Sequence, residues 1–277
     1  MVNEFTRLCI ALILIVIISK YVLVKTIRKL AEYLNLKPHI VGSIAGFATS
    51  IPELLTTCVS SLAGLPGAGL YNILSSNIIN FIQFFGTVII NKNLSGLKNR
   101  AIKVNVVLAV ITIIIPLLIA ISNTEMELFL APLLIMILIL FMLLNSEIHR
   151  SYLKREDRKI NKIIEKETKE EIKKRHVFKY TVILLLSAVL LYYVGEYLGD
   201  SIETLCISFN VSQITIGLLL GFFTSLPEFI AFFESQRHHN KNDNDIVGLV
   251  EAANGLLMSN VTNLFIILTL GIILINI

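Results

Sequence analysis

The sequence predicts an all-α polytopic membrane protein with about eight transmembrane helices that form two inverted-topology repeats. Three observations predict this fold. The chain of 277 residues is 55% apolar and has a mean hydropathy of +0.77, well above that of a soluble domain. Its apolar residues form long stretches separated by charged loops, and one motif occurs twice in opposite expected orientations.

Eight apolar stretches are each long enough to cross a bilayer core, which takes roughly 20 helical residues. The first stretch lacks the basic start and the small-residue cleavage site of a signal peptide, so we expect an ordinary span there. The stretches cover Phe5–Val24, His39–Leu62, Gly69–Ile90, Val104–Ile121, Glu127–Leu144, Phe178–Tyr197, Ile214–Phe233 and Ile246–Ile275.

The basic residues predict the orientation of the spans, because Lys and Arg near span ends stay in the cytoplasm. They follow the first, third, fifth and seventh stretches, and they are absent from residues 63–68, 122–126 and 198–213. We therefore expect a multi-pass protein of the cell membrane with its N-terminus and C-terminus outside.

A charged segment divides the chain. Residues Arg150 to Arg175 hold 11 of the 24 Lys and Arg, and i,i+4 pairs such as Glu165 with Lys169 favour a solvated helix. We expect three parts: residues 1–145 as the first membrane repeat with spans one to five, residues 146–176 as a cytoplasmic linker, and residues 177–277 as the second repeat with spans six to eight, two fewer than the first.

The composition argues against several other classes of protein. Cys9, Cys58 and Cys206 have neither the spacing of a disulfide framework nor that of a metal site. The formal net charge of +4 is what basic cytoplasmic loops produce, so no nucleic-acid partner is indicated. The sequence shows neither a paired nucleophile and base nor a phosphate-binding loop, so nothing in it points to an enzyme. We also expect no cofactor.

One motif occurs twice at a shift of 175 residues, with seven identities in twelve positions and no gap. The identities pair Gly42, Gly46, Phe47, Thr49, Ser50, Pro52 and Glu53 with Gly217, Gly221, Phe222, Thr224, Ser225, Pro227 and Glu228. A second piece follows at a shift of 183, where Ser76, Asn77 and Asn80 match Ser259, Asn260 and Asn263.

The two copies are expected to face opposite sides of the membrane. Lys25 and Arg28 match Asp200 and Glu203 at the shift of 175, so the matching segments carry opposite charge. Because the second span is predicted to run outward and the seventh inward, a two-fold axis in the membrane plane relates the repeats. Their motifs then meet near mid-depth.

Each copy places one glutamate, Glu53 or Glu228, near the middle of a span, where an ionisable side chain is costly and indicates function. The preceding proline lacks an N–H and frees carbonyl oxygens of the turn before it. Further hydroxyls and amides share a face with each glutamate or lie on the neighbouring helix. These are Thr49, Ser50, Ser76 and Asn80 in the first copy, and Thr224, Ser225, Ser259 and Asn263 in the second.

This set of oxygen atoms predicts a site for a hard cation. Calcium takes about 6 to 8 oxygens in flexible geometry, magnesium fits less well because it gives up water reluctantly, and sodium can use subsets of the same oxygens. One divalent ion, monovalent ions or protons can neutralise two carboxylates. Asn77 and Asn260 fit a ligand role and a brace between helices equally well, and Glu251 is expected at the cytoplasmic mouth.

The motifs resemble the two alpha repeats of the sodium/calcium exchangers in the cation/calcium antiporter superfamily. The pieces that carry the resemblance are GFATSIPE and SNIIN in the first copy and GFFTSLPE and SNVTN in the second. The similarity covers roughly residues 25–90 and 200–270. It implies an antiporter that moves calcium against inflowing sodium, with alternating access by sliding of the first and sixth helices.

The same resemblance implies roles for individual residues. Glu53 and Glu228 would be shared ligands of calcium and sodium, and Thr49 and Thr224 would contribute backbone oxygens to calcium. Asn80 and Asn263 would occupy the central position, where many relatives carry an aspartate. The flanking sodium sites would be lined by Ser50, Ser76, Ser225 and Ser259.

The sequence departs from the family pattern in three ways. Ser75 and Met258 replace the glycine before the serine, and Gly255 replaces the asparagine that is present as Asn72. Both central positions are amides, which lowers the negative charge. Family members usually have ten spans, so either the scaffold tolerates eight, a partner chain or second copy covers the exposed side, or the product is truncated and inactive.

Two alternatives to sodium-driven calcium exchange stay open. One is an antiporter for calcium or another divalent cation that is coupled to protons. The other is a membrane subunit or cation sensor that transports nothing, an alternative that the smaller number of spans motivates.

Overall fold

The computed structural model of the chain describes residues 2–34, 36–122, 126–148, 174–208, 212–240 and 245–277. Across these ranges the regular secondary structure is helical, and eight helices are long and apolar enough to cross a membrane. The predicted all-α, eight-span fold is therefore confirmed. The spans cover Cys9–Ala31, Pro38–Leu62, Pro66–Ile90, Arg100–Ile121, Leu130–Ile148, Val177–Ser201, Gln213–His238 and Ile246–Ile275.

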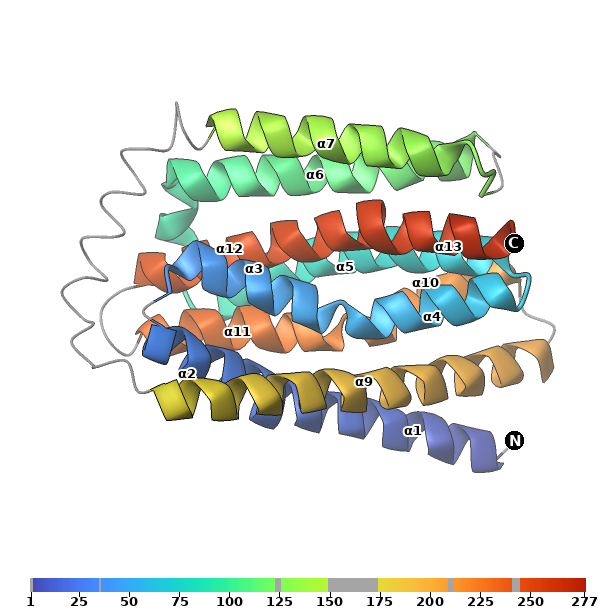
Figure 1. The fold of residues 1–277 in the computed structure, drawn as a ribbon, viewed down its shortest axis with the longest axis horizontal. Coiled ribbons are helices and arrows are strands. Elements are labelled where there is room, and N and C mark those ends of the chain that lie inside the picture. Colours follow the sequence, from blue (N-terminus) through green and yellow to red (C-terminus); the bar gives the residue numbers. More distant parts are fainter. Residues whose placement is uncertain (1, 35, 123–125, 149–173, 209–211, 241–244) are drawn as a thin grey trace.

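Several spans consist of more than one helical element (Figure 1). The first repeat contains α1 (Val2–Ile17), the π-helix η1 (Ile18–Leu23), α2 (Val24–Leu34), α3 (Pro38–Thr49), α4 (Ile51–Leu62), α5 (Pro66–Ile90), the 3-10 helix η2 (Leu94–Lys98), α6 (Arg100–Ile121) and α7 (Leu130–Ile148). The second contains α9 (Lys174–Ser208), α10 (Gln213–Thr224), α11 (Leu226–Asn240), α12 (Asp245–Val261), the π-helix η4 (Thr262–Ile267) and α13 (Leu268–Ile275).

The first span continues past Val24, where the apolar stretch ends, to Ala31. Lys25, Arg28 and Lys29 interrupt the apolar run there, but the backbone stays helical through η1 and α2. The predicted charged linker falls mostly on residues 149–173, which lie outside the described ranges.

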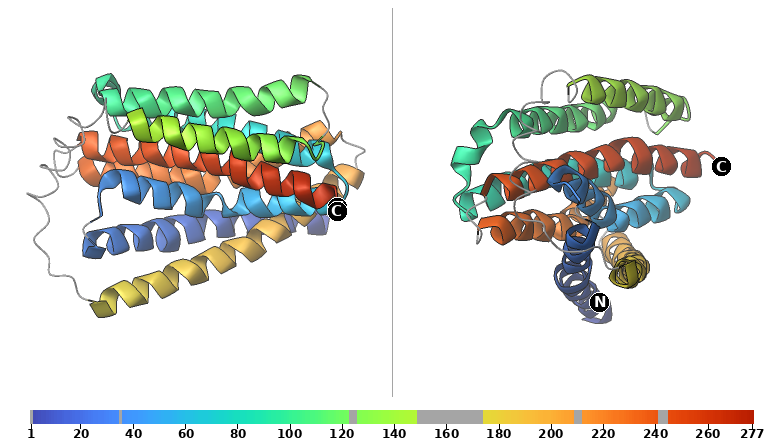
Figure 2. Two further views of the ribbon diagram at one scale, coloured as in Figure 1. Left: turned by 45° about the horizontal axis from the view of Figure 1, so that its top comes forward. Right: turned by 60° about the vertical axis from the view of Figure 1, so that its left-hand side comes forward.

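The helices form three layers in Figures 1 and 2. The central layer contains α3–α4, α5, α10–α11 and α12–α13, with α6 and α7 on one side and α1–α2 and α9 on the other. The second and seventh spans run in opposite directions, because α3 and α11 lie at one end of the bundle and α4 and α10 at the other. This arrangement agrees with inverted repeats. Both termini lie at the same end of the bundle, and which side of the membrane that end faces stays a prediction.

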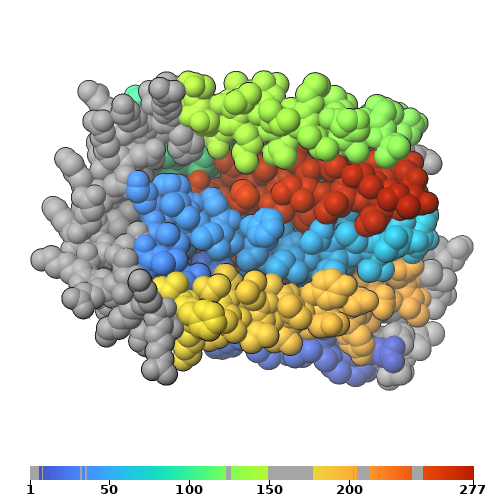
Figure 3. All heavy atoms as spheres, in the orientation of Figure 1, coloured from blue at the N-terminus to red at the C-terminus, as the bar shows by residue number. Residues whose placement is uncertain are grey.

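The largest cluster of buried apolar side chains joins the central layer to α6 and α7, whereas smaller clusters hold the opposite layer. In the opposite layer, α1–α2 and α9 contact each other near both ends. The Arg7 guanidinium lies 5.8 Å from the Tyr197 ring centroid, and the Tyr33 and Tyr180 rings stack at 5.6 Å. These contacts join the first and sixth spans into a pair, and the smaller apolar clusters pack this pair against the central layer. Figure 3 shows α9 beside α4 on one face of the molecule.

Glycines allow the repeats to pack closely against each other. A Cβ at Gly46 of α3 would overlap the Gly255 carbonyl oxygen and lie 3.0 Å from the Ser259 amide nitrogen of α12. A Cβ at Gly221 of α10 would likewise lie too close to backbone atoms of α5. Each motif helix of one repeat therefore packs directly on the backbone of the other repeat.

Candidate cation site

The second span is broken at the motif. Helix α3 ends at Thr49, Ser50 adopts φ −81° and ψ 6°, and α4 begins at Ile51 with Pro52 as its second residue. A proline is tolerated in the first helical turn because its missing N–H has no intrahelical acceptor there. The break places Glu53 in the first turn of α4, where the positive end of the helix dipole favours a carboxylate.

The seventh span repeats this arrangement. Helix α10 ends at Thr224, Ser225 adopts φ −78° and ψ 2°, and α11 places Glu228 in its first turn. The predicted disturbance before each proline is therefore present. The assumption that Thr and Ser lie on one continuous helical face with the glutamate is wrong, because the proline ends the preceding helix and the serine lies between two helices.

The two glutamates converge through hydrogen bonds that cross between the repeats. The Ser50 hydroxyl lies 3.3 Å from Oε1 of Glu228, and the Ser225 hydroxyl lies 3.5 Å from Oε1 of Glu53. Each hydroxyl is also within hydrogen-bond distance of a carbonyl of its own helix, Gly46 at 2.9 Å for Ser50 and Gly221 at 2.7 Å for Ser225. Both carboxylates are fully buried. Each glutamate thus lies beside the serine of the opposite copy, so neither repeat forms the site alone.

The remaining hydroxyls are arranged with less symmetry. Ser259 donates to Oε1 of Glu228 at 3.1 Å and lies 2.9 Å from the Ser50 hydroxyl oxygen. Its counterpart Ser76 donates instead to the Gly221 carbonyl at 3.4 Å. The environment of Glu228 therefore contains one more hydroxyl donor than that of Glu53.

The threonines bond mainly to their own helices. Thr49 donates to the Ala45 carbonyl at 3.0 Å and Thr224 to the Leu220 carbonyl at 3.0 Å. Both threonine side chains are fully buried beside the glutamate of the opposite repeat. Their hydroxyls stabilise the last turn of α3 and of α10, which positions the break.

The four asparagines of the second motif form a reciprocal network. Asn77 Nδ2 donates to the Asn260 carbonyl at 3.3 Å, and Asn260 Nδ2 donates to the Asn77 carbonyl at 3.2 Å. The side-chain oxygens of this pair accept from Asn263 Nδ2 at 3.1 Å and from Asn80 Nδ2 at 3.2 Å. Of the two roles left open for Asn77 and Asn260, this geometry favours a brace between helices over a cation ligand.

Four buried side-chain oxygens at the centre have no hydrogen-bond partner: Glu53 Oε2, Glu228 Oε2, Asn80 Oδ1 and Asn263 Oδ1. In the described part of the chain, no Lys, Arg or His forms an ion pair with either glutamate. A buried carboxylate is costly unless a positive charge and hydrogen bonds compensate it. Acceptor oxygens without donors are the groups that a hard cation binds.

Polar residues beyond the predicted set also join the helices. Asn72 Nδ2 donates to the Thr56 and Thr57 hydroxyls at 2.9 and 2.8 Å and ties α5 to α4. Glu251, expected at the cytoplasmic mouth, is only 5% exposed and pairs with Arg28 at 3.5 Å. The sequence shows Arg28 only as one of several basic residues after the first span, so its partner could not be identified from the pattern.

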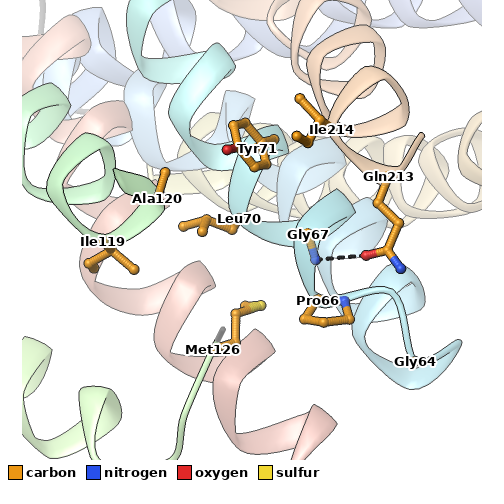
Figure 4. A pocket seen from close by; sticks show the side chains of 10 residues that line it. All are labelled: Gly64, Pro66, Gly67, Leu70, Tyr71, Ile119, Ala120, Met126, Gln213 and Ile214. Carbon is orange, nitrogen blue, oxygen red and sulfur yellow. Dashed lines mark hydrogen bonds between the residues drawn. The ribbon is translucent and has the colours of Figure 1, made fainter. Parts of the chain in front are cut away.

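A pocket of about 450 Å³ opens at the end of the bundle that is predicted to face outside. It lies between the start of α5, the start of α10 and the end of α6, with Leu70 and Tyr71 on its wall (Figure 4). At its rim the Gln213 side chain accepts a hydrogen bond of 3.0 Å from the Gly67 amide. Leu70 and Tyr71 precede Ser76 and Asn80 on α5, so the pocket lies along the same helix as two of the predicted ligands.

The fold and the site define a polytopic membrane protein with two inverted repeats and a buried pair of carboxylates. The chain belongs to the sodium/calcium exchanger protein family, whose model matches residues 5–146 and 179–276. It is therefore a multi-pass membrane protein of a cation-exchanger family. No curated protein sequence shows a significant match to the chain.

Solved structures of the sodium-calcium exchanger NCX_Mj share the fold. The structure soaked with 100 mM Na+ and 10 mM Sr2+ is 20% identical, with a TM-score of 0.58 over 99% of this chain and 82% of that chain. The structure soaked with zero Na+ and Ca2+ is 20% identical, with a TM-score of 0.55 over 98% of this chain and 82% of that chain. Identity at this level supports the fold alone.

Proposed function

We propose that this protein is a secondary active antiporter that exchanges calcium for sodium at a site between Glu53 and Glu228. One observation carries the proposal: two fully buried carboxylates converge without a cationic side chain beside them in the described part of the chain. Such a pair requires positive charge from outside the chain, because desolvated carboxylates are otherwise too costly.

The donor set favours calcium and sodium as the transported ions. One calcium ion balances the charges of Glu53 and Glu228, and the amide oxygens of Asn80 and Asn263 add neutral ligands. Sodium ions can use subsets of these oxygens together with Ser50, Ser76, Ser225 and Ser259. Thr49 and Thr224 would contribute backbone oxygens, because the last carbonyls of α3 and α10 lack intrahelical partners.

Shared ligands provide the physical route to exchange. Calcium and sodium compete for the same two carboxylates, so one ion leaves when the other binds. A site without ions would carry two negative charges through the closed intermediate, which is unfavourable in the membrane interior. The first and sixth spans lie together on one side of the central layer (Figures 1 and 2), a position from which they could slide across it between the two closed states.

The test is transport by purified protein in sealed vesicles. With sodium inside and none outside, calcium should enter, and collapse of the sodium gradient should stop uptake. Glu53→Gln and Glu228→Gln should each abolish uptake, whereas Glu127→Gln makes the same chemical change on an exposed residue and should not. Normal transport by either buried variant would refute the ligand assignment.

A proton gradient in the same vesicles distinguishes the alternatives. Uptake driven by protons and not by sodium would replace the sodium antiporter with a proton-coupled one. No uptake with either gradient, in protein that still binds calcium, would instead favour a subunit or sensor. Coverage of the bundle by a partner chain or a second copy stays a prediction.

A further inference from the structure

Glu251 and Arg28 form an ion pair between two parts of the bundle that the proposed function requires to move. Arg28 lies on α2, in the pair of spans one and six, and Glu251 lies on α12 in the central layer. Arg28 Nη2 is 3.5 Å from Glu251 Oε1, and the side chains are 12% and 6% exposed. The Ser235 hydroxyl of α11 donates to the same carboxylate oxygen at 2.6 Å.

The three residues connect three helices at one end of the bundle. Ser235 and Glu251 hold α11 and α12 together, and Arg28 attaches α2 to Glu251 of α12. Below them, Val24 of α2 packs on Ile230 and Ala231 of α11 in a small apolar cluster. Separation of α2 from α11 would therefore have to break the ion pair and expose Ala231.

The equivalent positions at the opposite end of the bundle lack the charges for this connection. At the repeat shifts, Glu203 takes the place of Arg28, Ala68 that of Glu251 and Ser60 that of Ser235. An alanine cannot pair with Glu203, and burial together with the neighbouring Asp200 raises the pKa of Glu203 above its ordinary value. The two ends thus differ in a fold that is otherwise built on a two-fold axis.

We infer that Arg28, Glu251 and Ser235 form a latch that keeps the α2 end of the transport path closed. The latch is one-sided, because Glu203, Ala68 and Ser60 at the equivalent positions lack the pair of opposite charges. It stabilises the state in which the α2 end is shut, and it must open before ions exchange there. This inference rests on the proposed antiporter function, but it concerns the population of states and not the ions that are carried.

The test measures the accessibility of two matched positions. Ala231 lies three residues after Glu228 and four before Ser235, and it is covered by α2. Its repeat equivalent Thr56 is covered by Gly199 of α9. Ala231→Cys and Thr56→Cys report opening of the two ends when a water-soluble maleimide reacts with purified protein. Both cysteine variants are made in a protein in which the native Cys9, Cys58 and Cys206 are replaced by alanine.

Loss of the ion pair should open the α2 end. Glu251→Gln and Arg28→Met should each raise the modification rate at Ala231→Cys about tenfold, the effect of losing a hydrogen bond to a charged group. The rate at Thr56→Cys should fall, because opening one end closes the other. Arg28→Lys keeps the charge and should stay near the parent rate, and Lys25→Met removes an exposed charge from the same helix and should change neither rate.

Each contrary result decides against the latch. Unchanged rates in Glu251→Gln and Arg28→Met would show that the ion pair does not hold α2. Faster reaction at both cysteines would show that the variants only loosen packing. Accessibility needs no transported ion, so failure of calcium exchange in vesicles would refute the proposed function and leave this measurement interpretable.

Discussion

Substitution of Gly221 by alanine tests whether the close approach of α10 and α5 builds the site. A Cβ at Gly221 would overlap the Ser75 hydroxyl and lie 2.6 Å from the Asn72 carbonyl oxygen and 2.8 Å from the Ser76 amide nitrogen. Two of these three atoms belong to the backbone of α5, so a change of side-chain rotamer cannot relieve the overlap. Helix α10 has to move away from α5.

The size of the effect follows from that displacement. Overpacking of a close interface costs about 1–3 kcal/mol, and backbone obstacles favour the upper part of this range. The Gly221 carbonyl also accepts hydrogen bonds from Ser225 at 2.7 Å and from Ser76 at 3.4 Å, so the shift displaces two predicted ligands. A change of about 1.4 kcal/mol in ion binding corresponds to tenfold in affinity.

Thermal unfolding in detergent, with and without calcium, measures both effects. Gly221→Ala should lower the unfolding temperature and weaken calcium binding at least about tenfold. Gly86→Ala is the matched control, because Gly86 lies in α5 and a methyl group there would meet no neighbouring atom within 4 Å. At that position alanine should leave calcium binding unchanged and favour the helix by up to about 1 kcal/mol. Equal stability and equal affinity in the two variants would refute the reasoning.

Three further predictions follow from the site. Asn77→Ala leaves the Asn260 carbonyl and the Asn263 amide without their partners, so chemical denaturation should show a loss of about 1–3 kcal/mol; a neutral effect would contradict the brace. Ser50→Ala removes the hydrogen bond to Glu228, and calcium titration should show an affinity lower by roughly tenfold, whereas an unchanged affinity would exclude Ser50 from the site. Calcium at 100 times its dissociation constant should stabilise the parent protein by about 2.7 kcal/mol and Glu228→Gln hardly at all, and equal stabilisation of both would place the ion elsewhere.

Much of the fold could be predicted because its main signals are local in the chain. Hydropathy marks each span from Pro38 to Ile275 within a few residues, since any segment that crosses lipid has to be apolar and to satisfy its own backbone. The one clear difference is the first span, where Lys25 and Arg28 end the apolar run before the helix ends. The duplicated motif also identifies Glu53 and Glu228, because a charged residue rarely occurs at the same position of two otherwise apolar repeats.

The sequence pattern could not predict the contacts between the repeats. A helical register relates Ser50 to Glu53, but the break before Pro52 turns the serine toward Glu228. The choice between ligand and brace for Asn77 depended on whether Asn260 lies opposite it, and only the packed helices place it there.

The sequence by itself determined the number of spans, the inversion of the repeats and the two acids of the repeated motif, because each follows from hydropathy, charge and repetition along one chain. The tertiary structure alone decided the crossed serine bonds, the asparagine network and the pairing of Arg28 with Glu251. The physical reason is that these bonds join helices far apart in sequence, and their donors and acceptors meet only where glycine contacts bring the two repeats together.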